Sequence, residues 1–89
     1  MLRALGLTSL HVVEVVHCFQ SYGIAITHSA GWKMVYSGDT RPCDSLVEIG
    51  RGCDVLLHEA TFEDQMTTEA AEKLHSTIKE ALEVAARQA

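Results

Sequence analysis

Basic residues are scarce in this sequence, and those present are not clustered. Lysine and arginine total 7 among 89 residues against 12 acidic residues, for a formal net charge of −5. From His58 to the end, seven acidic residues stand against three basic ones. A surface that binds nucleic acid is normally marked by clustered Lys and Arg. We therefore do not expect the chain to bind nucleic acid by itself; any such surface would lie elsewhere in a parent protein.

Cysteine is also rare, and long apolar runs are missing. Cys18, Cys43 and Cys53 form no CxxC pair, and their odd number argues against a disulfide framework. We expect reduced thiols that serve as small buried apolar residues in an intracellular protein. No apolar run is long enough to span a bilayer, and residues 1–7 do not resemble a signal peptide. We therefore expect no membrane partner.

What the sequence does have is a high apolar content for its length. Hydrophobic residues make up 47% and charged residues 21%, which is typical of a globular interior. A chain of 89 residues makes one small domain at most and buries a modest fraction of its surface. The composition thus indicates a segment of a larger core. We predict a single incomplete domain over 1–89, with 1–10 left unassigned.

Three short β-strands are predicted in the first forty residues. Residues 10–16 are rich in β-branched side chains and lead into His17. A second strand is expected at 23–28 and a third at 33–37. Between these two, the small residues at 29–31 favour a hairpin turn.

The remainder is predicted to be mainly helical, with one further strand. Gly and Pro mark a loop at 38–42, and a short helix at 44–49 is expected to end at Gly50 or Gly52. The apolar run at 54–58 predicts a buried strand, and a loop follows at 59–65. The predicted order, once the last two helices are added, is β-β-β-α-β-α-α, an α/β layered arrangement.

Those last two helices are predicted from capping residues. Thr67 or Thr68 can cap the first. Ser76 or Thr77 can cap the second, and Thr77 with Glu80 forms a capping box. The apolar residues that fall on one face of this second helix at helical spacing are Ile78, Ala81, Leu82 and Ala85.

Four short polar motifs follow predicted strands or open a helix. They are VVHC at 15–18, SGDT at 37–40, HEATF at 58–62 and HST at 75–77. Each has an ordinary structural explanation. His17 could be a hydrogen-bonded strand end, and Asp39 a turn former. His58 and Glu59 could lead into a solvated loop, and His75 could be a surface residue near a helix cap.

Taken together, the motifs supply two kinds of chemistry. A hydrolytic metal site needs imidazoles and a carboxylate from separate elements, and His17 with Asp39 offers such a pair. Cleavage of a phosphodiester also needs a proton donor for the departing oxygen. A carboxylate beside a histidine holds the imidazole protonated and directed, and Glu59 with His75 offers that pair.

The order VVH, GWKMVYSGDT, HEATF and HST resembles ribonuclease Z, the tRNA 3′-endonuclease of the metallo-β-lactamase superfamily, in its long eukaryotic form. SGDT-like motifs recur across that superfamily, whereas HEAT with HST distinguishes the tRNA-processing branch. The resemblance covers the chain after about residue 10 and identifies it as a C-terminal fragment. It implies roughly one half of a metallo-β-lactamase αββα sandwich.

The resemblance also implies roles for five residues. His17 matches an isolated metal-binding histidine, and Asp39 the aspartate that bridges two zinc ions. Glu59 would orient His75, which protonates the leaving 3′ oxygen, and His58 would play a supporting part. The intact enzyme cuts tRNA precursors, leaving a 3′ hydroxyl on the tRNA and a 5′ phosphate on the trailer. Its long form implies the nucleus, the mitochondrion or both.

The sequence departs from that family in what it lacks. The HxHxDH motif, which supplies ligands to both zinc ions, is absent, as is the final metal-binding histidine. Two ligands, His17 and Asp39, are too few for a closed or catalytic zinc site. We therefore expect the isolated chain to be inactive, requiring the missing half of the domain or a partner chain. A non-catalytic interaction module or a decayed copy remains the alternative; HEAT and HST argue against another hydrolase of the superfamily.

Overall fold

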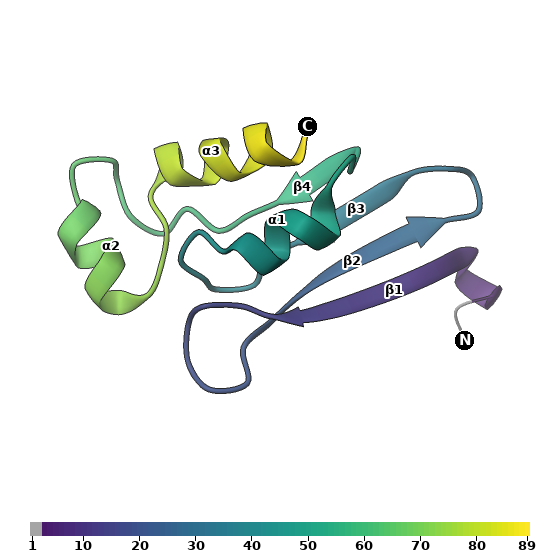
Figure 1. The fold of residues 1–89 in the computed structure, drawn as a ribbon, viewed down its shortest axis with the longest axis horizontal. Coiled ribbons are helices and arrows are strands. Elements are labelled where there is room, and N and C mark those ends of the chain that lie inside the picture. The colour runs from purple at the N-terminus through teal and green to yellow at the C-terminus, as the bar shows by residue number, and fades with distance from the viewer. Residues whose placement is uncertain (1–2) are drawn as a thin grey trace.

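A computed structural model describes residues 3–89, in which one mixed sheet carries helices on a single face (Figure 1). The predicted order of strands and helices is confirmed, preceded by a short 3-10 turn. In chain order the elements are η1 (Arg3–Leu5), β1 (Leu7–Glu14), β2 (Tyr22–His28), β3 (Lys33–Tyr36), α1 (Asp44–Gly50), β4 (Val55–Leu57), α2 (Thr67–Lys73) and α3 (Ile78–Gln88).

The sheet has four strands in the order β1-β2-β3-β4. β1 and β2 are antiparallel, as are β2 and β3, while β3 and β4 are parallel. The predicted turn between β2 and β3 is confirmed: the Gly31 N–H donates to the carbonyl of His28 at 2.8 Å. Gly31 has a φ of +98°, which glycine adopts without steric cost. The parallel pair is joined through α1, a βαβ crossover.

The first strand differs from its prediction at both ends. β1 begins at Leu7 rather than at residue 10, because Leu7 and Ser9 pair with the end of β2 across a register shift. It ends at Glu14 rather than at residue 16, since the N–H of Val15 bonds the carbonyl of Ser21 and closes the connection to β2. Residues 1 and 2 of the unassigned segment lie outside the described residues.

One face of the sheet is covered and forms the core. Ala25 and Val35 are paired across β2 and β3, and both are buried against Leu46 of α1. α3 lies beside α1, where the amide of Gln88 donates to the carbonyl of Leu46 at 3.1 Å. At Gly50 a Cβ would lie 2.1 Å from that same amide nitrogen. A side chain at this position would therefore displace the Gln88 amide from its bond to Leu46.

The opposite face of the sheet is apolar and half-exposed. Its alternating side chains point away from both helices that pack on the core. Six of them are between 46% and 53% exposed, namely Leu10, Val12, Tyr22, Tyr36, Val55 and Leu57. A sheet covered by helices on one face and apolar on the other is one half of a layered sandwich, as predicted. The high apolar content is thus explained.

Helix α3 does not bury the predicted apolar face. Val84 and Gln88 are its buried residues, whereas Ile78 is 48% and Leu82 67% exposed. The predicted capping box is confirmed, with both of its hydrogen bonds present. The rotation of the helix is fixed by contacts with other segments, because Glu80 pairs with Arg41 and Gln88 donates to the carbonyl of Leu46. Polar contacts, rather than apolar spacing, thus decide which side faces inward.

The cysteines and helices bear on two further expectations. All three cysteines are free thiols. Cys43 is buried and Cys53 half-buried, but Cys18 is exposed, so burial was wrongly predicted for that thiol. Among residues 3–89, no helix has the length and apolar character needed to cross a membrane.

Candidate active site

Four loops meet at one end of the sheet, and they are those that carry the polar motifs. An isolated antiparallel bridge joins Val16, beside His17, to Arg41. A parallel bridge joins Phe62 of the HEATF segment to Thr77 of the HST segment. The strands and α3 thus hold these loops rigidly, which is how polar groups are positioned for function.

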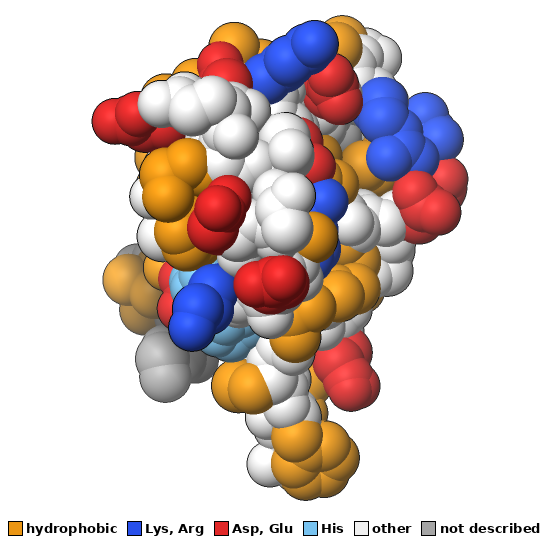
Figure 2. All heavy atoms as spheres, turned by 90° about the vertical axis from the view of Figure 1, so that its left-hand side faces the viewer, with side chains coloured by type: hydrophobic (Ala, Val, Ile, Leu, Met, Phe, Trp, Pro, Cys, Tyr) orange, Lys and Arg blue, Asp and Glu red, His pale blue; other side chains and the backbone are white. Residues whose placement is uncertain are grey.

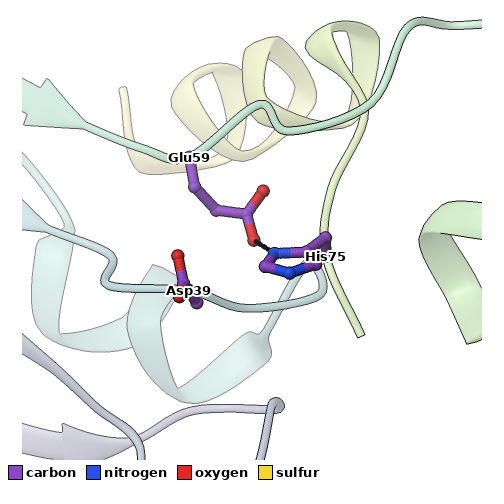
Figure 3. A group of neighbouring side chains, drawn as sticks. All are labelled: Asp39, Glu59 and His75. Atoms are coloured by element: carbon purple, nitrogen blue, oxygen red, sulfur yellow. Dashed lines mark hydrogen bonds and ion pairs between the residues drawn. The ribbon is translucent and has the colours of Figure 1, made fainter. Parts of the chain in front are cut away.

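The centre of this cluster is the pair formed by Glu59 and His75. Nδ1 of His75 donates to Oε1 of Glu59 at 2.5 Å (Figure 3). The same oxygen accepts the N–H of Thr40 at 2.9 Å. The second oxygen accepts the N–H of Ser76 at 3.0 Å, and both the N–H and hydroxyl of Thr61, at 3.1 and 2.9 Å. These five hydrogen bonds occupy the acceptor sites of the carboxylate.

This environment keeps Glu59 ionised. Burial acts to raise the pKa of Glu59, but the hydrogen bonds from Ser76, His75, Thr40 and Thr61 outweigh it and lower the pKa to about 2. An ionised carboxylate only accepts, so Nδ1 of His75 must carry the hydrogen. The other ring nitrogen, Nε2, is left free to act on a bound molecule.

His17 lies against this pair, as expected. Its ring centroid is 4.7 Å from that of His75. Nδ1 of His17 is 2.8 Å from the carbonyl oxygen of Leu74, which can only accept a hydrogen bond. In the neutral ring the hydrogen is therefore on Nδ1, and Nε2 carries the lone pair. A metal-binding histidine is commonly oriented through its other nitrogen in this way.

Asp39 faces the same space from the loop after β3 (Figure 3). Ligand atoms of Asp39, Glu59 and His75 all lie within 4.8 Å of one another. Of the two carboxylates, Glu59 is taken up by hydrogen bonds, whereas Asp39 is exposed. Asp39 could therefore supply an oxygen ligand to a metal ion, and Nε2 of His17 could supply a nitrogen ligand. Nitrogen and oxygen donors of this kind suit zinc.

His58 is held differently from the other histidines. Its Nδ1 bonds the carbonyl oxygen of Glu59 at 2.7 Å. Its Nε2 is buried and has no hydrogen-bond partner among residues 3–89. The His58 ring thus contacts the backbone of Glu59 rather than the carboxylate that bonds His75. Such a contact supports the position of Glu59.

The sequence did not single out the residues that hold this pair in place. Thr40 and Ser76 are fully buried, and the hydroxyl of Ser76 donates to the carbonyl of Thr40 at 2.7 Å. The hydroxyl of Thr40 in turn accepts the N–H of Val16 at 3.0 Å. The available signal was that both residues lie inside motifs already recognised, SGDT and HST.

Arg41 and Glu80 form a second unpredicted pair at the edge of the site. The guanidinium donates from two nitrogens to the two oxygens of Glu80, each at 2.7 Å. The hydrogen bond to Glu80 raises the pKa of Arg41, and the reciprocal bond is the main cause that lowers the pKa of Glu80. Both residues are ionised at neutral pH. A two-pronged bond of this kind fixes geometry as well as charge.

The surface at this end of the molecule has mixed charge. Figure 2 shows histidine side chains surrounded by apolar, acidic and basic ones, with acidic and basic groups interspersed on this face. No large basic area is visible from this side.

Comparison with known proteins gives one family. A model of the beta-lactamase superfamily domain matches residues 7–89. The chain is 46% identical over 87 residues to the human zinc phosphodiesterase ELAC protein 2, and 48% identical over 94 residues to the mitochondrial tRNase Z TRZ4 of Arabidopsis thaliana. It is 34% identical to a crystal structure of the long form of RNase Z from yeast, with a TM-score of 0.91.

These similarities cover nearly all of this chain but little of each relative. They take in 98% of the chain and 10% of the human protein, and 94% and 10% for the Arabidopsis protein. For the yeast structure the shares are 99% and 13%. The chain thus spans about a tenth of the length of the relatives it matches. The predicted resemblance to ribonuclease Z and the fold class are confirmed.

Proposed function

The chain belongs to the beta-lactamase superfamily, and from this premise we propose that it forms part of a zinc-dependent endoribonuclease that removes 3′ trailers from tRNA precursors. The observation that carries this proposal is the hydrogen bond of 2.5 Å between Glu59 and His75. It belongs to the HEAT and HST motifs, on which the resemblance to ribonuclease Z depends most. The proposed role of the chain is to deliver a proton and to supply two metal ligands.

In the proposed reaction His75 is the general acid. In its doubly protonated form, it gives the Nε2 proton to the 3′ oxygen of the tRNA, as the oxygen of a water molecule bonds to phosphorus and the bond from the 3′ oxygen to phosphorus breaks. Glu59 accepts the remaining Nδ1–H and balances the charge of the imidazolium. Because five hydrogen bonds keep the carboxylate fixed and ionised, the imidazole needs little reorganisation before the proton moves.

We assign His17 and Asp39 as the ligands that this chain gives to the metal centre. Bound zinc would supply Lewis-acid stabilisation of charge on the phosphate. His17 is already turned by its bond to the Leu74 carbonyl so that Nε2 is available. His58 is assigned a supporting role, because its contact is with the backbone of Glu59. Two zinc ions, as in the family, would need further ligands from other segments.

Residues 1–89 are proposed to be a single incomplete domain. The apolar face of the sheet, about half-exposed at Val12 and Leu57, would be covered by the remaining part of the domain or by a partner chain. That part would also bring the HxHxDH ligands and the surface for tRNA. The 89-residue chain alone is therefore expected to bind zinc weakly and to leave tRNA precursors uncut.

A chimera tests this proposal directly. The matched segment of the human zinc phosphodiesterase is replaced by this chain, and cleavage of a tRNA precursor with a 3′ trailer is measured with zinc present. We expect the chimera to cut at rates within about tenfold of the parent, and the isolated chain to show no cleavage. Zinc-dependent trimming by the isolated chain, or a folded chimera that cannot cut, would contradict the proposal.

The second candidate is a non-catalytic interaction module. The half-exposed apolar sheet face favours it, because such a face suits docking on a partner. That reading, however, gives no reason for a carboxylate with five hydrogen bonds beside two histidines. The chimera separates the two candidates: a module or decayed copy would fold in the human protein without restoring cleavage.

For the compartment we propose the mitochondrion, the nucleus or both. The Arabidopsis relative is named as mitochondrial, and the nuclear alternative rests on the resemblance to the long form. Imaging the natural gene product with a fluorescent tag, in cells with stained mitochondria and nuclei, tests this assignment. Signal confined to other compartments would contradict it.

A further inference from the structure

Arg41 connects the loop after β3 to the backbone of the proton donor. Besides its two bonds to Glu80, it donates from Nη1 to the carbonyl oxygen of His75 at 2.8 Å. The guanidinium is partly buried, with 23% of its side chain exposed. A hydrogen bond from a charged donor to a carbonyl oxygen is stronger than a hydrogen bond between neutral groups. Arg41 therefore restrains the peptide group that follows the Cα of His75, from which the imidazole projects.

His75 is also held through the peptide groups on both of its sides. The N–H of His75 bonds the carbonyl of Ala70 in α2, and the N–H of Ser76, which shares a peptide group with the His75 carbonyl, bonds Oε2 of Glu59 at 3.0 Å. Leu74, immediately before it, has a φ of +59°, an uncommon conformation for a residue with a side chain. The HST segment thus leaves α2 through an unfavourable backbone geometry. The bond from Arg41 to His75 secures the segment on the side of the active site.

We infer that Arg41 is a positioning residue for proton delivery, which holds the His75 imidazole where its Nε2 can reach the leaving oxygen. The inference rests on the proposed function. Glu80 completes the arrangement, since it aligns the guanidinium while capping α3 through the N–H of Thr77 at 2.9 Å. Lysine could not replace Arg41, because a single ammonium does not reproduce the planar arrangement of donors.

The other arginine ion pairs of the described region lack this connection. Arg51 pairs with Glu48 on the surface of α1, and Arg87 pairs with Asp44 between α3 and α1. The side chains of Arg51 and Arg87 are 59% and 51% exposed. Neither bonds any residue of the HEATF or HST segments. Arg87→Ala is therefore a matched control, since it removes an arginine ion pair without touching the proposed mechanism.

The test compares two leaving groups in the chimera. One substrate is a tRNA precursor with its natural 3′ oxygen at the cleaved bond, and the other carries sulfur at that position. When the bond to phosphorus breaks, oxygen must take up a proton, whereas sulfur leaves as a stable thiolate. Because both rates come from one enzyme preparation, any misfolded fraction lowers them equally and their ratio is unaffected.

We expect Arg41→Ala and Arg41→Lys to lower kcat about 10- to 100-fold on the oxygen substrate, with KM little changed. On the sulfur substrate the loss should be less than about threefold, because no proton is needed. His75→Ala should show the same pattern with a larger loss on oxygen. Arg87→Ala should change neither rate.

Three results would each overturn a conclusion. In the first, the sulfur substrate restores the activity of His75→Ala, but the Arg41 variants lose the same factor in kcat on both substrates. Arg41 then supports only the fold, and the inference fails. The inference fails in the same way if the Arg41 variants keep full activity on oxygen. If His75→Ala itself is not rescued, the proposed proton donor is wrong, and the inference about Arg41 falls with it.

Discussion

The two functional surfaces of this chain are completed to very different degrees. At the loop end of the sheet, Glu59 accepts five hydrogen bonds, all from groups within the chain. On the outer sheet face, Leu10, Val12 and Leu57 remain about half-exposed, and no helix of residues 3–89 covers them. The part of the site that we propose delivers the proton is thus completed by contacts within this chain, whereas the apolar face depends on another layer.

This contrast follows from the kind of interaction on which each region depends. A hydrogen-bonded loop cluster needs short connections and a few motifs, which one chain segment can provide. Burial of a sheet face needs a second surface of similar area. The same division applies to the proposed metal site, since His17 and Asp39 would come from this segment and further ligands from the part that covers the sheet.

The largest expected effect is on catalysis at the loop end. In the chimera, Glu59→Gln should lower the rate of tRNA cleavage by about 100-fold or more. An amide cannot accept all five hydrogen bonds and no longer balances a charged His75. Glu83→Gln, on the exposed side of α3, is the matched control and should leave the rate unchanged. Similar rates for the two variants would mean that Glu59 has no part in the reaction.

The next effect sharpens the contrast between the two faces of the sheet. In the 89-residue chain, Leu46→Ala should lower the free energy of unfolding by about 2–5 kcal/mol, because Leu46 is completely buried. Leu57→Ala should cost less than about 1 kcal/mol, since that side chain is 51% exposed. Urea unfolding followed by circular dichroism measures both.

The same two substitutions should behave alike in the chimera, where a second layer covers the outer face. There Leu57→Ala is expected to approach the cost of Leu46→Ala, measured as the loss of thermal stability. If Leu57→Ala stays mild in the chimera, the outer face is not packed against the rest of the domain.

Acid pH should weaken the loop end selectively. The folded pKa of Glu59, about 2, lies below its ordinary value of 4.5. Its contribution to stability is therefore fully present above pH 4.5 and is lost as pH falls from 4.5 toward 2. Urea unfolding at several pH values should show that the free energy of unfolding falls less between pH 4.5 and pH 2 for Glu59→Gln than for the unmodified chain. Parallel curves for the two proteins would contradict the low pKa.

The smallest effect is expected at the surface ion pair of Arg87 and Asp44. Although the two are 2.6 Å apart, their side chains are 51% and 87% exposed. Arg87→Ala should therefore change the free energy of unfolding by less than about 0.5 kcal/mol. A larger loss in urea unfolding would show that this pair contributes to the contact between α1 and α3.

Most of the fold could be predicted from the sequence because its signals are local. Hydrophobic runs, the turn at Gly31 and the capping box of Thr77 each act within a few residues. The start of β1 was missed because the pairing of Leu7 depends on β2, and the buried side of α3 was missed because Glu80 and Gln88 reach other elements. Long-range polar contacts leave no periodic signal.

The candidate site divides in the same way. His17, Asp39, Glu59 and His75 were identifiable because they occupy short motifs at strand ends. The role of Arg41 could not be identified from the sequence, since its partners lie 34 and 39 residues further along the chain. Nor could the sequence alone indicate that Glu59 would be occupied by hydrogen bonds while Asp39 stays open.

The most direct measurement of the central claim is the pair of cleavage rates for the His75→Ala chimera on oxygen and sulfur leaving groups. Our account predicts a loss of about 100-fold or more with the oxygen leaving group, which is the smallest rate enhancement that general acid catalysis typically gives. With the sulfur leaving group it predicts near-normal cleavage. Equal losses on the two substrates would contradict it, because His75 would then not be the group that protonates the departing 3′ oxygen.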